Sequence, residues 1–113
     1  MSELAQRRCR PCKGGTAPLD EDAAQRLLAQ LPPASWVLTA DARAIRREFS
    51  FRDFYRTMSF VNALAHIANI EDHHPDLEIG YNYCRVTYTT HSIRGLSEND
   101  FVCAAKLELI PLS

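Results

Sequence analysis

The sequence predicts an α+β domain in which an antiparallel sheet carries its helices on one face. Two observations lead to this fold class. The expected elements run helix, two strands, helix, two strands, helix, and strands that follow each other through short turns pair as hairpins. A chain of 113 residues with 46% hydrophobic and 24% charged residues suits one globular domain. We therefore expect residues 19–113 to form a four-stranded antiparallel sheet with three helices packed on one face.

The first helix is predicted over residues 21–31. Asp20 is a suitable N-cap, and the two acidic residues that follow it favour the positive end of the helix dipole. Pro32 and Pro33 end the helix because proline lacks the backbone donor that would continue it. One face of this helix carries its apolar residues, namely Ala23, Leu27, Leu28 and Leu31.

A hairpin is predicted from strand-like residues 36–38 and 45–51, joined by a turn at 41–43. The second strand alternates in polarity, so it has one buried and one solvated face. The buried face is predicted to contain Ile45, Arg47, Phe49 and Phe51, and the solvated face Arg46, Glu48 and Ser50.

A long helix is predicted over residues 52–70, which contain neither glycine nor proline. Its apolar surface extends beyond one stripe, so we expect it to cross the sheet centrally and also to contribute to a subunit interface. A charged residue in place of Phe60 or Leu64 should then weaken subunit association, while His66 is expected to be structural. The predicted stripe consists of Phe54, Met58, Val61, Ala65 and Ala68.

The second half of the chain repeats the pattern of two strands and a helix. Residues 77–79 form a short strand, Gly80 and Asn82 supply turn chemistry, and residues 83–90 form the clearest strand of the sequence. The last helix is expected over 101–110, after a Ser97–Asp100 pair that resembles a capping box.

Charge and hydropathy exclude several classes of protein. A net charge of −1 gives no electrostatic basis for binding nucleic acid or an anionic membrane. No run of eighteen apolar residues is present, and no apolar stretch follows the basic N-terminus as in a secretory signal. We expect a cytoplasmic protein.

Four cysteines pose the question of metal or redox chemistry. Cys9 and Cys12 form a CxxC pair in residues 1–18, a Gly- and Pro-containing leader that we expect to be flexible and loosely packed, while Cys84 and Cys103 lie in predicted elements. Structural zinc normally takes four ligands, usually from two such pairs, and a thioredoxin-like pair lies between a strand and a helix. Reduced thiols in the leader are therefore expected, with metal or redox use as the lesser alternative.

The stretches His73-His74-Pro75 and Thr90-His91-Ser92 hold three of the four histidines. Imidazole exchanges protons near neutral pH, since its ordinary pKa is about 6.5. Pro75 ends the long helix, so two adjacent rings lie at a helix exit, where a pocket can form. Four acidic residues between positions 66 and 84, with no Lys or Arg there, favour protonated histidines. Taken alone, His-His-Pro also fits a helix terminator with solvated rings.

One family shares this pattern. His73-His74-Pro75, Tyr81-Asn82 and Thr90-His91-x-x-x-Gly95-Leu96-Ser97-x-x-Asp100 resemble the pterin-4a-carbinolamine dehydratases, whose bacterial members often begin with a CxxC leader. The resemblance spans residues 9–106 and implies a four-stranded sheet under helices, in dimers or tetramers. It also implies dehydration of 4a-hydroxytetrahydrobiopterin to quinonoid dihydropterin, in cofactor recycling for aromatic amino acid hydroxylases. No metal or organic cofactor is used in the family.

The resemblance also assigns roles to residues. Dehydration needs an acid for the departing hydroxyl and a base for a ring N–H proton. By resemblance His73 and His74 are the acid/base pair, in an order left open, and His91 is a third catalytic residue that binds the pterin and completes the proton exchange. Tyr81 and Asp100 are further candidates, although Tyr81 could serve packing and Asp100 could equally cap a helix or orient His91. The remaining expected substrate contacts are Pro75, Thr90, Ser92 and Ile93.

The sequence departs from the family pattern at two positions. Leu77 stands where animal members have an aromatic residue, and Asn69 where an acidic residue is common. Two other kinds of function stay open. One is a metal-dependent enzyme with His73, His74 and His91 as ligands. The other is a non-catalytic binding protein or dimerisation cofactor of a transcription factor, a second role known for animal members.

Overall fold

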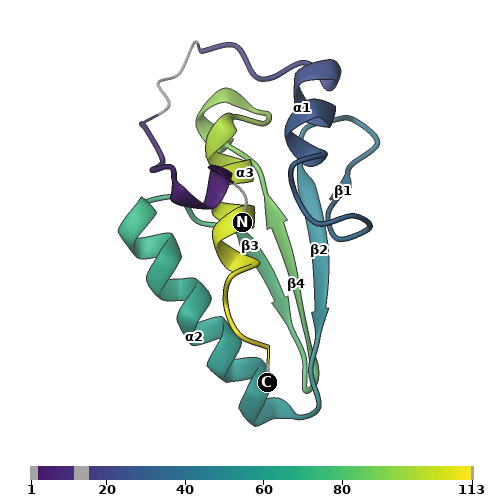
Figure 1. Cartoon of the computed structure of the whole chain (residues 1–113), viewed down its shortest axis with the longest axis vertical. Helices are drawn as coiled ribbons and strands as arrows, with labels where there is room; N and C mark the ends of the chain where they lie inside the picture. Colours follow the sequence, from purple (N-terminus) through teal and green to yellow (C-terminus); the bar gives the residue numbers. More distant parts are fainter. Residues whose placement is uncertain (1–2, 12–15, 113) are drawn as a thin grey trace.

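The fold is the predicted α+β domain, seen in a computed structural model that describes residues 3–11 and 16–112. One sheet contains four strands in the order β1-β2-β4-β3, and every neighbouring pair is antiparallel. The helices lie against one face of this sheet, with α2 running along one side of the molecule (Figure 1). The strands are β1 (Val37–Leu38), β2 (Ile45–Ser50), β3 (Asp76–Ile79) and β4 (Tyr83–Tyr88), and the helices are α1 (Glu21–Leu28), α2 (Phe54–Glu71) and α3 (Glu98–Leu107).

The predicted alternation of polarity sets the two faces of the sheet. Ile45 pairs with Tyr88 and Phe49 with Cys84, and all four side chains are buried under the helices. The intervening residues face away from the helices, where Arg85 Nε contacts Glu48 Oε1 at 2.6 Å. A one-residue slip of β2 against β4 would exchange these two faces, so burial fixes the register.

α1 begins as predicted, with Asp20 Oδ1 accepting a hydrogen bond from the Ala23 N–H at 2.8 Å. It ends at Leu28, three residues before the expected end. The Leu31 N–H bonds instead to the Leu28 carbonyl at 3.0 Å, a tighter turn than that of an α-helix. The proline at position 32 explains this, because the residue before a proline is disfavoured in the α conformation.

α2 packs along one side of the molecule rather than crossing the sheet centrally as expected, and its buried face differs from the predicted stripe (Figure 1). Phe54 is 50% exposed, whereas Phe60 and Leu64 are 2% and 1% exposed. Phe60 packs against two aromatic rings of the sheet side, Phe49 at 4.5 Å and Phe51 at 5.2 Å between ring centroids. The prediction that Phe60 and Leu64 mediate subunit contacts is therefore wrong, because both belong to the core. The residues buried on α2 are Thr57, Phe60, Val61, Leu64 and Ala68.

α3 begins with the predicted capping box of Ser97 and Asp100, and ends at Leu107 rather than at residue 110. Eight of its ten residues are buried. A short 3₁₀ helix, η1 (Glu3–Gln6), accounts for part of this burial because it packs against α3.

The leader therefore differs from the expected loosely packed segment over its described part. Leu4 is fully buried, and Ala5 is 8% exposed. Lys106 Nζ donates to the Ala5 carbonyl at 2.8 Å, and Arg7 pairs with Glu98 at 2.6 Å. Both partners belong to α3, so residues 3–11 extend the domain core. Cys12, the second cysteine of the CxxC pair, lies outside the described residues.

Trp36 links the sheet to the segment that follows α3. Its ring lies 6.1 Å from Phe49 and 6.0 Å from Tyr88, between centroids. Its Nε1–H donates to Glu108 Oε2 at 2.8 Å, and the same carboxylate pairs with Arg47. The Glu108 carboxylate, at the C-cap of α3, thus contacts both Trp36, which precedes β1, and Arg47 of β2.

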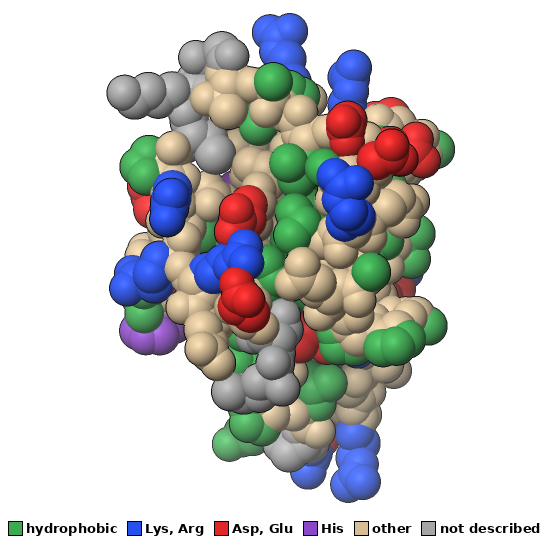
Figure 2. Space-filling view, turned by 45° about the horizontal axis from the view of Figure 1, so that its top comes forward, with side chains coloured by type: hydrophobic (Ala, Val, Ile, Leu, Met, Phe, Trp, Pro, Cys, Tyr) green, Lys and Arg blue, Asp and Glu red, His purple; other side chains and the backbone are tan. Residues whose placement is uncertain are grey.

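The surface shows no segregation of charge on the face seen in Figure 2, where acidic and basic side chains are interspersed. Among the residues that the structure describes, no helix has the length and apolar character that a membrane span requires.

Candidate active site

The first histidine pair is positioned by the way α2 ends. Asp72 takes the left-handed conformation at φ 50°, ψ 44°, and the His73 N–H bonds back to the Ala68 carbonyl at 3.1 Å. This is a common helix C-terminus, in which a left-handed residue turns the chain sharply out of the helix axis. Pro75 then leads directly into β3. The predicted helix exit at His73-His74-Pro75 is thus present.

The third histidine lies on a compact loop between β4 and α3. The loop holds a 3₁₀ turn, η2 (His91–Ile93), and Arg94 in the left-handed conformation at φ 56°. Its base is closed by Thr90 and Gly95, which exchange two backbone hydrogen bonds of 2.8 and 3.4 Å. His91 and Ser92 are exposed at the tip of this closed loop.

These two loops face the same cavity, which has a volume of about 560 Å³. Cavities of this size accept small molecules such as a bicyclic heterocycle. His73, His74 and His91 all line it, as do Thr90 and Ser92. The other lining residues are Cys9, Arg10, Pro11, Ile70, Glu71, Asp72, Thr89 and Asn99.

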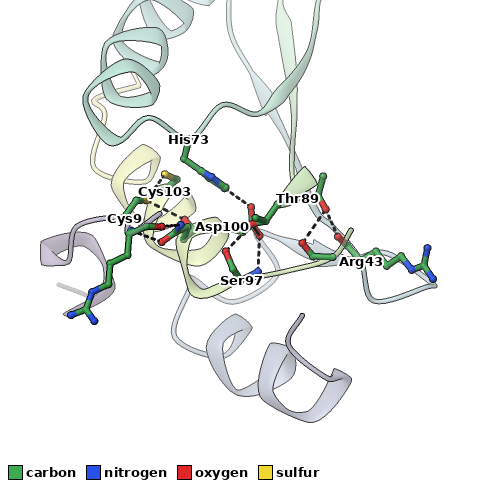
Figure 3. Close-up of polar contacts among 11 residues, drawn as sticks. Cys9, Arg43, His73, Thr89, Ser97, Asp100 and Cys103 are labelled. Carbon is green, nitrogen blue, oxygen red and sulfur yellow. Dashed lines mark hydrogen bonds and ion pairs between the residues drawn. The ribbon is translucent and has the colours of Figure 1, made fainter. Parts of the chain in front are cut away.

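His73 is the most constrained of the three histidines. Its side chain is 11% exposed, and Nε2 lies 2.6 Å from Asp100 Oδ1 (Figure 3). The ring also stacks on Tyr88, with centroids 5.8 Å apart and 7° between planes. His74 and His91 are exposed, so adjacent histidines of one motif have opposite environments.

Asp100 holds the polar side of this arrangement together. Its carboxylate is fully buried, and Oδ2 accepts hydrogen bonds from Thr90 Oγ1 at 2.8 Å and from the Ser97 N–H at 2.9 Å. Asp100 therefore caps α3 and also contacts His73. The expected alternative, in which Asp100 orients His91, is wrong. Asp100 Oδ1 contacts His73, and Asp100 Oδ2 accepts from Thr90 and Ser97.

Several expected contact residues do not line the cavity. Tyr81 is 64% exposed at the turn between β3 and β4, the end of the hairpin remote from His74. Ile93, the last residue of η2, is buried, and Pro75 and Asp100 also lie outside the lining set. Contacts of these four residues with a ligand remain a prediction.

Sequence reasoning missed one wall of the cavity. We call Cys9, Arg10 and Pro11 the leader wall, and the stretches His73–His74 and Thr89–Ser92 the core wall. The leader wall is held by the Cys9 N–H, which donates to Glu71 Oε1 at 2.7 Å, and by Arg8 Nε, 3.0 Å from Glu71 Oε2. A glycine-containing leader carries no periodic pattern, so nothing in the sequence signals this contact.

Glu71 is an unusually well satisfied carboxylate at this wall, with a side chain only 4% exposed. Burial alone would raise the pKa of Glu71, but the Cys9 N–H, Lys106 and Arg8 outweigh it, so the pKa lies below its ordinary value. Glu71 is therefore present as a carboxylate at neutral pH, where it binds the Cys9 N–H and Arg8 of the leader.

The hydroxyl of Tyr88 is the one buried side-chain polar atom of the described residues with no hydrogen-bond partner. Burial raises the pKa of Tyr88, so it stays neutral. Its contribution to the site is the aromatic face that supports the His73 ring.

Metal ligation receives no geometric support in the part of the chain that the structure describes. No three His, Cys, Asp or Glu side chains there are arranged to hold one ion. Adjacent His73 and His74 diverge, one towards Asp100 and one towards solvent.

Comparison with solved structures identifies the fold class of this chain. The crystal structure of a transcriptional coactivator/pterin dehydratase from Brucella melitensis matches with a TM-score of 0.75 and 34% identity, covering 80% of this chain and 95% of that one. A pterin dehydratase-like protein described as a RuBisCO assembly factor in the alpha-carboxysome matches with a TM-score of 0.58 at 22% identity, which shows a shared fold. The chain thus has the pterin dehydratase fold.

The sequence matches are closer still. The profile described as pterin 4 alpha carbinolamine dehydratase matches residues 17–110. A protein of Nitrosomonas eutropha is 56% identical over all of this chain and 97% of its own, and one of Legionella pneumophila is 54% identical over 95% and 94%. Both carry the name pterin-4-alpha-carbinolamine dehydratase provisionally. This chain belongs to the pterin 4 alpha carbinolamine dehydratase family.

Proposed function

We propose that the protein removes water from 4a-hydroxytetrahydrobiopterin to give quinonoid dihydropterin, in cofactor recycling for aromatic amino acid hydroxylases. The observation that carries this proposal is the convergence of His73, His74 and His91 on one cavity, in a member of this family. Three imidazoles can divide the acid and base roles of a dehydration near neutral pH.

The reaction needs two proton transfers. An imidazolium gives its proton to the 4a hydroxyl, the carbon–oxygen bond breaks and water leaves. A neutral imidazole takes the proton of a ring N–H, whose electron pair forms the new carbon–nitrogen double bond. Each group of this kind typically contributes about 10²–10⁴ in rate.

The geometry supports different duties for the three rings. A buried carboxylate that already accepts two hydrogen bonds serves as an acceptor, so His73 Nε2–H donates to Asp100 and Nδ1 is the nitrogen that exchanges a proton. Stacking on Tyr88 keeps that nitrogen in place. His74 and His91 are exposed and can regain or release protons through solvent between turnovers.

The remaining contacts follow from the two loops. Thr90 and Ser92 border the cavity and are proposed to contact the pterin, while Pro75 and Ile93 shape the loops that carry the histidines. Tyr81 lies at the far end of the hairpin from His74, and its contact with the pterin stays a prediction.

A stopped-flow assay tests the proposal directly. Enzyme added to freshly generated 4a-hydroxytetrahydropterin should accelerate its dehydration, and the rate should survive incubation with a chelator. No acceleration would refute catalysis, and a rate lost with chelator and restored by metal would favour the metal-dependent alternative.

A second candidate function is a non-catalytic one, based on association. The first turn of α2 exposes two aromatic residues, Phe54 at 50% and Tyr55 at 80%, and the Brucella relative is described as a coactivator as well as a dehydratase. We propose that this surface holds a homodimer or homotetramer together. Replacing Tyr55 by Glu should lower the mass measured by light scattering, and an unchanged mass would reject this surface.

A further inference from the structure

Two cysteines from distant parts of the chain meet beside the cavity. Cys9 Sγ lies 3.3 Å from Cys103 Sγ, although 94 positions separate them in sequence (Figure 3). Cys9 belongs to the leader wall and is half-buried, whereas Cys103 lies on α3 and is fully buried. Both are free thiols.

The meeting of the two thiols is fixed by the backbone on either side of Cys9. The Cys9 N–H is held by Glu71, and Arg10 exchanges hydrogen bonds with the Asn99 side chain, at 3.0 Å from its N–H and 2.6 Å to its carbonyl. Asn99 stands one turn before Cys103 on α3. The thiols are therefore brought together by contacts that do not depend on sulfur.

We propose that Cys9 and Cys103 form an oxidisable dithiol pair, which closes to a disulfide when a hydroperoxide enters the cavity and so fixes the leader wall to α3. A disulfide bond is about 2.05 Å long, so the sulfurs must approach by roughly an ångström. The family profile begins at residue 17, so this device lies partly outside the region that defines the family.

The chemistry balances with the hydroperoxide as the sole oxidant. The Cys9 sulfur attacks the peroxide, a sulfur–oxygen bond forms, the oxygen–oxygen bond breaks, and water or an alcohol leaves with a sulfenic acid on Cys9. The Cys103 sulfur then attacks Cys9, the sulfur–sulfur bond forms, and the hydroxyl leaves as water with the Cys103 proton. Two thiols lose two electrons and two protons in total.

The order of the two steps follows from access. Cys9 lines the cavity and meets the oxidant first. The hydrogen bond with Cys9 and burial raise the pKa of Cys103, so this thiol is unreactive towards solvent oxidants. Because its sulfur lies 3.3 Å from that of Cys9 and is closed off from solvent, it is placed for the second, internal step. The reaction should be slow and require excess peroxide, because the attacking species is the thiolate.

The chain offers two internal comparisons. Cys84 is fully buried in β4, and burial raises its pKa to about 11, so it should stay reduced. Cys12 is the rival partner of Cys9, as the spacing of the CxxC pair alone would suggest. The Cys12→Ser variant removes that rival and leaves the Cys9–Cys103 pair intact.

The experiment treats the reduced full-length protein with hydrogen peroxide, blocks free thiols with N-ethylmaleimide and digests with trypsin without reductant. Trypsin should release residues 9–13 and 95–106, because it cleaves after Arg8, Lys13, Arg94 and Lys106 but not between Arg10 and Pro11. A linked pair of these two peptides is expected from wild type and from Cys12→Ser. Dithiothreitol should separate it, and Cys9→Ser should lack it.

Thermal unfolding gives a second readout that needs no substrate. Closing so long a loop should raise the midpoint of the oxidised Cys12→Ser protein by about 10 °C, reversibly. Cys9→Ser, at a half-buried site, should show no such rise after the same treatment. A bond confined to Cys9 and Cys12 in wild type, with no linked peptide from Cys12→Ser, overturns the proposal. Stable sulfinic acid on Cys9 overturns it as well.

Discussion

The two walls of the cavity are built in opposite ways. The core wall rests on Asp100, a fully buried carboxylate that joins His73, Thr90 and the start of α3. The leader wall rests on Glu71 of α2 and Asn99 of α3, whose side chains accept hydrogen bonds from the backbone N–H groups of residues 9 and 10. The core wall is anchored by one buried carboxylate and the leader wall by side chains that bind its backbone, so a change in each should affect different measurable quantities.

The largest effect is expected at the core wall. His74→Ala should lower kcat by about 10²-fold or more, since a general acid or base typically contributes this much. His66→Ala, on the exposed side of α2, is the matched control and should retain wild-type kcat. Stopped-flow assays of both variants measure the difference, and a loss smaller than tenfold for His74→Ala would contradict the assignment.

Asp100→Asn should lower both activity and stability. The amide has one oxygen and one NH₂ group, so it cannot accept from His73 on one side and from the Ser97 N–H on the other. Leaving one buried donor unpaired should lower the free energy of unfolding by about 1–3 kcal/mol. Urea denaturation measures this loss, and unchanged stability would show that the network is dispensable.

Glu71→Gln should act on substrate binding more than on chemistry. The amide still accepts from the Cys9 N–H but loses its charge partner Arg8, so the leader wall is held less firmly. We expect KM to rise about threefold, as the loss of one partly exposed ion pair implies, with kcat within twofold of wild type. The control is Glu98→Gln, which removes the charge partner of Arg7, a residue that precedes the leader wall. This variant should leave KM unchanged.

Acidification should release the leader wall before the core unfolds. The pKa of Glu71 is lowered in the folded protein, so its contribution to stability is complete above the ordinary carboxyl pKa of about 4.3. That contribution is lost as pH falls through the lowered pKa. Proteolysis of the leader should therefore increase below about pH 4, and the Glu71→Gln variant should show no such step.

The smallest effect is expected on the open face of the sheet. Arg85 contacts Glu48 and Glu78, but its side chain is 40% exposed. Such pairs contribute about 0–1 kcal/mol, so Arg85→Ala should change the free energy of unfolding by less than about 1 kcal/mol and leave kcat unchanged. A larger loss would mean that the open face supports the site.

The core wall was largely predictable from sequence and the leader wall was not. Pro75 marks the end of α2, and the alternation in β2 and β4 sets the sheet, so local rules place both histidine loops. The face of α2 was predicted only in part, because its apolar residues form more than one stripe and the choice depends on Phe49 and Phe51 of the sheet. The spacing of Ser97 and Asp100 also predicted that Asp100 caps α3. Its contact with His73 was not predictable, because that contact depends on how two distant loops pack together.

The leader escaped prediction for a different physical reason. Leu4 is buried against α3 and Cys9 against Cys103, yet both come from a stretch with no helical or strand periodicity. Their partners lie about ninety or more residues away, so only the closed fold brings them together.

The aromatic contacts around Trp36 give this chain its own optical probe. It is the only tryptophan, and its ring touches Tyr88, which in turn supports the His73 ring. Its emission should therefore shift to the red when the core opens and should be quenched by energy transfer when a pterin occupies the neighbouring cavity. A single fluorescence titration could then follow ligand occupancy and folding in unlabelled protein.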